Sequence, residues 1–394
     1  MGNLGLDKLT PGGDQGPPRK GRPTFVCAGV FLSALGGTHG AIPAVQTELA
    51  VRSMVFSRVL PGMLALVLLS SCAKNPKPQV ATEVAGPKNF IFFNLSRERI
   101  HEPSFLDNPA IVGAQLKYTW RELEPERDQY AFDEVLADLQ FLESNGKRLF
   151  IQLQDLSFDS RLNVPEYLVL DPEFSGGANR KYSYDEERKV AEFDGWVARR
   201  WDPMVVSRFG KMLQALGEQV DGRIEGVSLA ETSVGFGRSE GTIPFGYSHE
   251  SYTEGIRLIM TAAAEAFPES EVIQYANFMP GEWLPWEDNG YLRAVYEHAA
   301  AVGVGVGGPD LMPFRKGQQN HCQKFIRERG AGTAAGLAVQ WGNLEEIDPE
   351  TGVPVTVEKL HRFAEEELAL DYVFWGTQEP FYTQAVLPYL RELS

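Results

Sequence analysis

From residue 88 onward, short apolar runs alternate with longer segments whose apolar positions recur with the period of a helix. This alternation predicts parallel β/α units, because strands that are buried on both faces form nearly continuous apolar runs. The predicted strands are 90–94, 111–116, 148–153, 224–229, 271–276, 302–307, 336–340 and 371–375. The predicted helices are 132–144, 203–219, 252–267, 291–301, 318–329 and 357–368.

Eight such units in about 300 residues predict an α/β fold of the (β/α)8 TIM-barrel type. The rival fold is an open, doubly wound sheet, which usually carries a glycine-rich phosphate turn after its first strand. Here that place is occupied by Phe93-Asn94-Leu95-Ser96, which has no glycine. The barrel is therefore the favoured fold, with its domain assigned to 89–394.

One connection is long and aromatic, the insertion 157–201 after the third strand. Within it, 181–184 and 190–193 alternate around a charged turn, which predicts a β-hairpin. A segment that leaves the carboxyl end of a barrel strand is expected over the active face. A small satellite core is the structural alternative.

The N-terminal region contains the parts of a secretory signal. Residues 1–53 show no sustained period, whereas 54–71 contains Arg58, a short apolar run and small residues. The sequence Leu69-Ser70-Ser71-Cys72 resembles the lipobox of bacterial lipoproteins, and the alternative is a short buried helix ending in cysteine. The resemblance implies cleavage before Cys72 and a lipid anchor on its thiol.

This resemblance sets the expected organisation and location. We expect Met54 to be the true start, 1–53 to be a misassigned or disordered extension, and 72–88 to be a tether. The mature protein would be an exported lipoprotein of the cell envelope, attached to the membrane through Cys72. Ala73 after the cysteine implies the outer membrane.

Composition narrows the choice of partner. The net charge of −16 argues against nucleic acid, which requires a basic face. The three cysteines, Cys27, Cys72 and Cys322, form neither a disulfide framework nor a zinc pattern. We therefore expect no metal and no cofactor.

Two segments resemble a known superfamily. The stretch 120–133 reads Trp-Arg-Glu-Leu-Glu-Pro-Glu-Arg-Asp-Gln-Tyr-Ala-Phe-Asp, and 164–168 reads Val-Pro-Glu-Tyr-Leu. Both resemble segments of the large retaining glycoside hydrolase superfamily that groups β-galactosidases, cellulases and mannanases. The resemblance implies a TIM barrel whose fourth strand ends in the catalytic acid/base, and Glu231 is the matching residue. Alternation along this strand predicts that Val227, Leu229 and Glu231 share its inward face.

The chain departs from the superfamily pattern twice. Ala230 stands where an asparagine usually precedes the acid/base, and Gln340 stands where the nucleophilic glutamate is expected on the seventh strand. Since a carboxamide cannot act as an attacking carboxylate, a second carboxylate must come from elsewhere, or there is none.

Candidates for that second carboxylate lie just beyond predicted strands. Asp310 and Glu379 follow the sixth and eighth strands and rank equally, with Asp155 after the third strand behind them. Glu282 is a further candidate in a loop.

Polar and aromatic residues near the strand ends are the candidate carbohydrate-binding set. Those expected to form hydrogen bonds with sugar hydroxyls are Gln152, Gln154, Asn277, Gln340 and Asn343. Those expected to stack on sugar rings are Trp120, Trp283, Trp341 and Trp375.

Three hypotheses for function remain open. The first is a cell-envelope glycoside hydrolase that acts on an oligo- or polysaccharide through paired carboxylates. The second is a non-catalytic glycan-binding lipoprotein on a degenerate barrel, which Gln340 favours. The third is an envelope protein with an interaction or structural role and no saccharide ligand.

Overall fold

A computed structural model describes residues 86–185, 190–237 and 241–393, all within one unit of the chain, 84–394. The expectations for the extension, the signal, Cys72 and most of the tether lie outside the described residues. No described helix combines the length and apolar character needed to cross a membrane.

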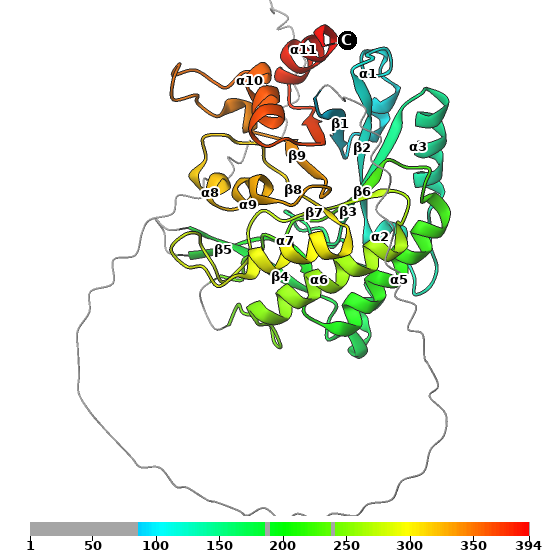
Figure 1. Cartoon of the computed structure of the whole chain (residues 1–394). Coiled ribbons are helices and arrows are strands. Elements are labelled where there is room, and N and C mark those ends of the chain that lie inside the picture. The colour runs from blue at the N-terminus through cyan, green and yellow to red at the C-terminus, as the bar shows by residue number, and fades with distance from the viewer. Residues whose placement is uncertain (1–85, 186–189, 238–240, 394) are drawn as a thin grey trace, which may run out of the picture. The chain divides into compact units, whose positions relative to one another are not determined.

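Eight parallel strands form a closed barrel (Figure 1). β1 and β10 close it side by side, with Lys88 opposite Tyr372 and Ile91 opposite Trp375. The predicted fold class is thereby confirmed. In order around the barrel, the strands are β1 (Lys88–Asn94), β2 (Ile111–Thr119), β3 (Arg148–Gln154), β6 (Gly226–Leu229), β7 (Glu271–Tyr275), β8 (Gly305–Gly308), β9 (Ala335–Val339) and β10 (Tyr372–Gly376).

Helices surround this barrel, and α5 (Pro203–Val220) shows why they form. The Asp202 side chain accepts a hydrogen bond from the Met204 backbone N–H, and Pro203 occupies the first turn. The remaining α-helices are α1 (Pro103–Leu106), α2 (Trp120–Leu123), α3 (Asp133–Ser144), α4 (Glu166–Leu170), α6 (His249–Ala266), α7 (Tyr291–Val302), α8 (Lys316–Asn320), α9 (Cys322–Glu328), α10 (Val357–Arg362) and α11 (Leu387–Glu392). Shorter turns are η1 (Arg97–His101), η2 (Pro172–Phe174), η3 (Asn343–Glu345), η4 (Phe363–Glu367) and η5 (Tyr382–Val386).

Two of the predicted helices are not continuous α-helices. The segment 318–329 is divided at His321, whose backbone (φ −109, ψ −106) is not helical, so α8 and α9 are separate. The segment 357–368 continues from α10 into the π-helical turn η4.

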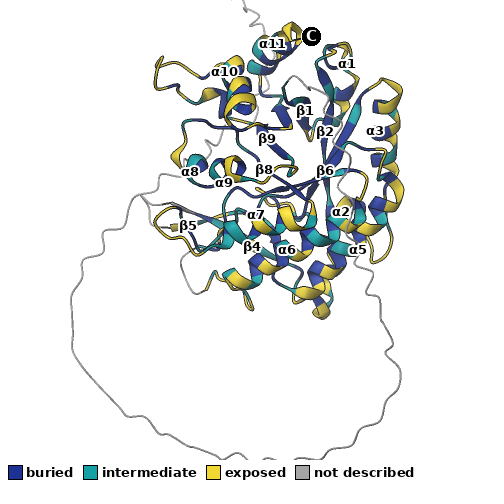
Figure 2. Cartoon of the chain, in the orientation of Figure 1, coloured by how far each residue is buried: buried dark blue, intermediate teal, exposed yellow. Residues whose placement is uncertain are grey.

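The interior of the barrel is filled by aromatic rings. Phe374 packs against Phe150 with ring centroids 4.8 Å apart and against Phe90 at 5.9 Å. Above them, the Gln115 amide donates to the Ser228 hydroxyl at 3.1 Å and to the Tyr275 hydroxyl at 3.0 Å. The barrel is therefore a packed core with a polar layer, and Figure 2 shows its strands as mostly buried.

The prediction for the inward face of the fourth strand was wrong. Ser228 of β6 points into the barrel, where it meets Gln115, while Val227 and Leu229 belong to the core between the strands and the outer helices. Glu231 lies beyond the last residue of β6, where strand alternation no longer determines the direction of a side chain.

The predicted hairpin is present as β4 (Ala178–Asp185) and β5 (Val190–Ala198), paired antiparallel. The Ala198 N–H donates to the Asp155 carbonyl, and the Tyr182 N–H donates to the Gly235 carbonyl. Gly195 approaches Ser157 so closely that a Cβ would lie 2.1 Å from the Ser157 carbonyl oxygen, which only glycine permits. The hairpin is thus fixed beside the segments that follow β3 and β6.

Candidate functional site at the barrel mouth

Glu231 lies just after β6 and is half-buried. Its carboxylate accepts a hydrogen bond of 2.6 Å from the Asn277 side-chain amide. Asn277 follows β7 and is itself held by the Ser233 N–H, which donates to its side-chain oxygen at 3.2 Å. Two neighbouring strand ends therefore fix the position of this carboxyl group.

The environment of Glu231 favours its protonated form. The pKa of Glu231 is raised to about 7, chiefly by burial and also by the negative charge of Asp310, against the hydrogen bond from Asn277 and the cations Lys181 and Arg200. A carboxyl group of this kind holds a proton near neutral pH and can donate it.

The backbone beneath Glu231 is supported by a buried ion pair. Arg200 donates from Nε and Nη2 to the two oxygens of Asp155, at 2.8 and 2.5 Å. Its Nη1 donates to the Glu231 carbonyl oxygen at 2.7 Å and to the Tyr252 hydroxyl at 2.9 Å. Asp155 is therefore the counterion of Arg200, and it is not open to a ligand.

Asp310 follows β8, and two carboxamides orient it. Its Oδ1 accepts from Gln340 Nε2 at 3.3 Å and from Asn343 Nδ2 at 3.0 Å. Asn343 is fixed in turn, because its own side-chain oxygen accepts from the Gln340 backbone N–H at 2.9 Å. Gln340, at the position expected for a nucleophile, thus holds the carboxylate whose charge reaches Glu231.

The other two candidate carboxylates are engaged elsewhere. Glu379 accepts from the Thr383 hydroxyl at 2.7 Å and lies 3.7 Å from the Arg99 guanidinium. Glu282 accepts from the backbone N–H groups of Tyr291 and Leu292, at 3.0 and 2.7 Å, so it caps the N-terminus of α7. Of the candidate second carboxylates, Asp310 is the one whose charge is among the main influences on the pKa of Glu231.

Two predicted binding glutamines lie on the inward face of β3. Gln152 and Gln154 alternate with Leu153, which belongs to the outer core. Both are buried, and the Gln152 Oε1 atom has no hydrogen-bond partner among the described residues. A buried polar atom of this kind is available to a ligand or to water.

The four predicted tryptophans fall into two groups. Trp120 and Trp375 are 1% and 0% exposed, and their indole N–H groups donate to Glu124 and Asn89, so neither presents a ring face to the mouth. Trp283 is half-buried and lies parallel to Phe278 with ring centroids 5.6 Å apart. Trp341 is 60% exposed.

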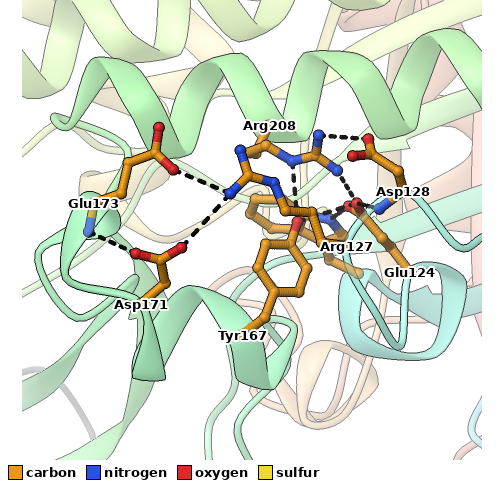
Figure 3. Close-up of polar contacts among 8 residues, drawn as sticks. Glu124, Arg127, Asp128, Tyr167, Asp171, Glu173 and Arg208 are labelled. Atoms are coloured by element: carbon orange, nitrogen blue, oxygen red, sulfur yellow. Dashed lines mark hydrogen bonds and ion pairs between the residues drawn. The ribbon is translucent and has the colours of Figure 1, made fainter.

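The segment that carries the strongest sequence resemblance forms a buried polar cluster (Figure 3). Glu124 is fully buried and accepts hydrogen bonds from Trp120 Nε1 at 2.9 Å, from the Tyr167 hydroxyl at 3.0 Å and from Arg208. Arg208 of α5 also donates to Asp128 at 2.7 Å. These contacts tie α2, α4 and α5 together, so this segment serves architecture.

Sequence reasoning missed three cations around the mouth, Lys117, Lys181 and Arg200. Lys117 lies on β2 and Lys181 on β4, and both are influenced by the charge of Glu231. Alternation along β2, which places Lys117 on the same face as Gln115, was the available signal for Lys117. Among the described residues, no cluster of three or more His, Cys, Asp or Glu side chains is arranged to hold a metal ion.

Comparison with known proteins gives remote structural matches only. No known family model and no curated protein matches the chain. A family 39 glycoside hydrolase from the gut symbiont Bacteroides cellulosilyticus WH2 is 10% identical with a TM-score of 0.42, and the match covers 74% of this chain but only 56% of that protein. GH5_18 from Streptomyces cattleya in complex with GlcNAc is 13% identical with a TM-score of 0.45, covering 74% of this chain and 70% of that one.

A variant of the same Streptomyces cattleya protein in complex with Manb1-4GlcNAc is 14% identical with a TM-score of 0.46, with coverage of 74% and 70%. Similarity of this degree decides neither substrate nor activity.

Proposed function

We propose that this protein is a glycoside hydrolase that acts on an oligo- or polysaccharide. Glu231 is the general acid and Asp310 the second carboxylate. The observation that carries the proposal is this pair of groups. Glu231 lies at the barrel mouth with its pKa raised to about 7, and part of that increase comes from the charge of Asp310, which two amides orient.

The proposed chemistry follows from the two environments. Glu231 transfers its proton to the glycosidic oxygen as the bond from that oxygen to the anomeric carbon breaks. Asp310 accepts hydrogen bonds from the amides of Gln340 and Asn343, which orient its carboxylate, and we assign it the role of base or nucleophile. The anomer released first, observed by NMR, distinguishes a nucleophile from a base that activates water.

The test compares three variants on a panel of neutral and acidic glycans and their aryl glycosides. Glu231→Gln keeps the hydrogen bond from Asn277 but has no proton to give, so turnover falls by about 10²–10⁴-fold. In Asp310→Asn, turnover falls by the same factor or by a larger one. Glu379→Gln is the matched control because its carboxylate lies on Arg99 and Thr383, and it keeps wild-type turnover. Undiminished turnover in Glu231→Gln would end the assignment.

Gln340 supports a second candidate, a glycan-binding protein without activity. It places a carboxamide at the position of the superfamily nucleophile. This candidate predicts that calorimetry detects glycan binding to the wild-type protein while no product appears from any member of the panel.

For location, we propose an exported lipoprotein anchored in the cell envelope through Cys72. The support is the apolar run of 54–71 with the lipobox-like Leu69-Ser70-Ser71-Cys72. Mass spectrometry of the protein from membranes tests this: the expected N-terminus is a lipid-modified Cys72. A chain that begins near Met1 without lipid refutes it.

A further inference from the structure

Lys117 projects into the mouth of the barrel. Its neighbours Leu116 and Tyr118 face outward, and the Tyr118 hydroxyl donates to Asp138 of α3. Gln115, two residues before it, lies inside the barrel on Ser228 and Tyr275. Lys117 therefore occupies the next inward layer, where its ammonium lies 5.8 Å from the centre of the Phe92 ring.

This ammonium has neither a hydrogen bond nor an ion pair with any described residue, although the side chain is half-buried. The pKa of Lys117 is lowered to about 8, chiefly by burial and also by the charge of Arg161, against the charges of Glu231 and Asp159. The other cations nearby are each neutralised by an aspartate: Lys181 by Asp194, Arg200 by Asp155 and Arg161 by Asp159. Lys117 thus forms no direct ion pair with a described residue, although the charges of Glu231 and Asp159 act on it from a distance.

A second polar group beside Lys117 is also incomplete. Gln152 lies opposite Lys117 in the pairing of β2 with β3, and it is 5% exposed. Its Oε1 has no hydrogen-bond partner among the described residues. A half-buried ammonium beside a buried carboxamide whose oxygen has no partner is complementary to an anion that also carries hydroxyl groups.

We propose that Lys117 and Gln152 form the subsite for an acidic sugar, one with a carboxylate or sulfate group, in the glycan that Glu231 and Asp310 process. Lys117 binds the anion and Gln152 a neighbouring hydroxyl. This inference rests on the proposed function, because it names the substrate class of the same site. Lys117 is a specificity residue in it and takes no part in bond cleavage.

The acidity of the whole chain does not oppose such a substrate. The net charge of −16 is spread over 394 residues. At physiological ionic strength, charges more than about 8 Å away are largely screened, whereas a half-buried ammonium in direct contact is not. Local pairing therefore decides which glycan binds.

The test uses calorimetry on Glu231→Gln, which holds a glycan without cleaving it. The probes are short oligouronates, the same oligomers with their carboxyl groups reduced, sulfated oligosaccharides and their desulfated forms. We expect at least one acidic oligomer to bind about 10-fold or more tightly than its neutral form. Adding Lys117→Met abolishes this preference, whereas Lys117→Arg retains it; the uronate and sulfate pairs show which anion is bound.

Lys117→Met is expected to leave the protein folded, since it removes a half-buried charge that has no partner, and thermal unfolding checks this. The inference is overturned if neutral and acidic forms bind equally, or if Lys117→Met keeps the preference. If Lys117→Met cleaves neutral glycans with an unchanged KM, the proposal of a hydrolase is supported and that of an acidic subsite is refuted. If the wild-type protein prefers acidic glycans but cleaves none, the acidic subsite is supported and the hydrolase is refuted. If no glycan binds, both proposals are refuted.

Discussion

Two glutamates at the carboxyl ends of barrel strands show how environment separates architecture from chemistry. Glu124, after β2, is fully buried and accepts from Trp120, Asp128, Tyr167 and Arg208. Glu231, after β6, is half-buried and accepts from Asn277 alone among the described residues. The carboxylate of Glu124 has a buried guanidinium as its counterion. The carboxyl group of Glu231 instead accepts a hydrogen bond from a neutral amide.

The counterion decides what each carboxylate can do. When a buried carboxylate is paired with its own cation, removal of either partner leaves an uncompensated buried charge. A desolvated carboxyl group without a direct cation retains its proton to higher pH. Position at a strand end is therefore insufficient evidence for a catalytic role; the partners of the side chain must be known.

The largest effect on stability is expected at the architectural glutamate. Glu124→Ala leaves Arg208 buried without its main counterion, so the free energy of unfolding in urea should fall by about 3–5 kcal/mol. The matched control is Glu166→Ala, which breaks an exposed ion pair with Arg121 and should cost about 0–1 kcal/mol. Equal losses in the two variants would contradict the comparison.

At Glu231, in contrast, substitution is expected to increase the free energy of unfolding. Because the pKa of Glu231 is about 7 in the folded protein against an ordinary 4.5, the fold loses stability as pH rises from about 4.5 to about 7. Glu231→Gln removes that cost, so it should be more stable than the wild-type protein at pH 8 by up to about 3 kcal/mol, less as water reaches the carboxyl group. The difference should shrink toward pH 5, as measured by urea unfolding at both pH values; an equal difference at both would refute the assignment.

Trp120 tests whether the resembling segment binds sugar. Trp120→Phe removes the indole donor to Glu124, so the free energy of unfolding should fall by about 2 kcal/mol. Glycan affinity should not change, because the ring has no exposed face. Weaker glycan binding by calorimetry, at unchanged stability, would place Trp120 in the site instead.

A smaller, directional effect is expected at Asp310. Its negative charge raises the pKa of Glu231, so Asp310→Asn should lower that pKa. The pH above which no further stability is lost, which follows the folded pKa of Glu231, then moves downward in a series of urea unfolding curves, and the total loss becomes smaller. Glu379→Gln is the control and should leave that pH where it is, since Glu379 is held by Arg99 and Thr383.

The fold could be predicted because apolar runs and helical periods are local properties. All eight strands and the inserted hairpin overlap the segments where the pattern placed them, although the predicted strand 302–307 begins at the last residue of α7. What the pattern could not show was the break at His321 or the inward turn of Ser228, because both depend on packing that joins distant segments.

The site could be predicted only in part for the same reason. Residues near strand ends were identified, but Asp155 and Glu282 proved to serve Arg200 and the α7 N-terminus. The segment with the clearest resemblance lies around Glu124 and not at the mouth. The proposed role of Lys117 was not predicted from the sequence, because it depends on the lack of an ion-pair partner, which only three-dimensional contacts reveal.

The most direct test is a titration of the Glu231 carboxyl group by ¹³C NMR, with the signal assigned by its loss in Glu231→Gln. A midpoint near pH 7 is predicted, because the group is desolvated and faces Asp310. A midpoint near the ordinary 4.5 would show a solvated carboxylate and would contradict its role as a proton donor.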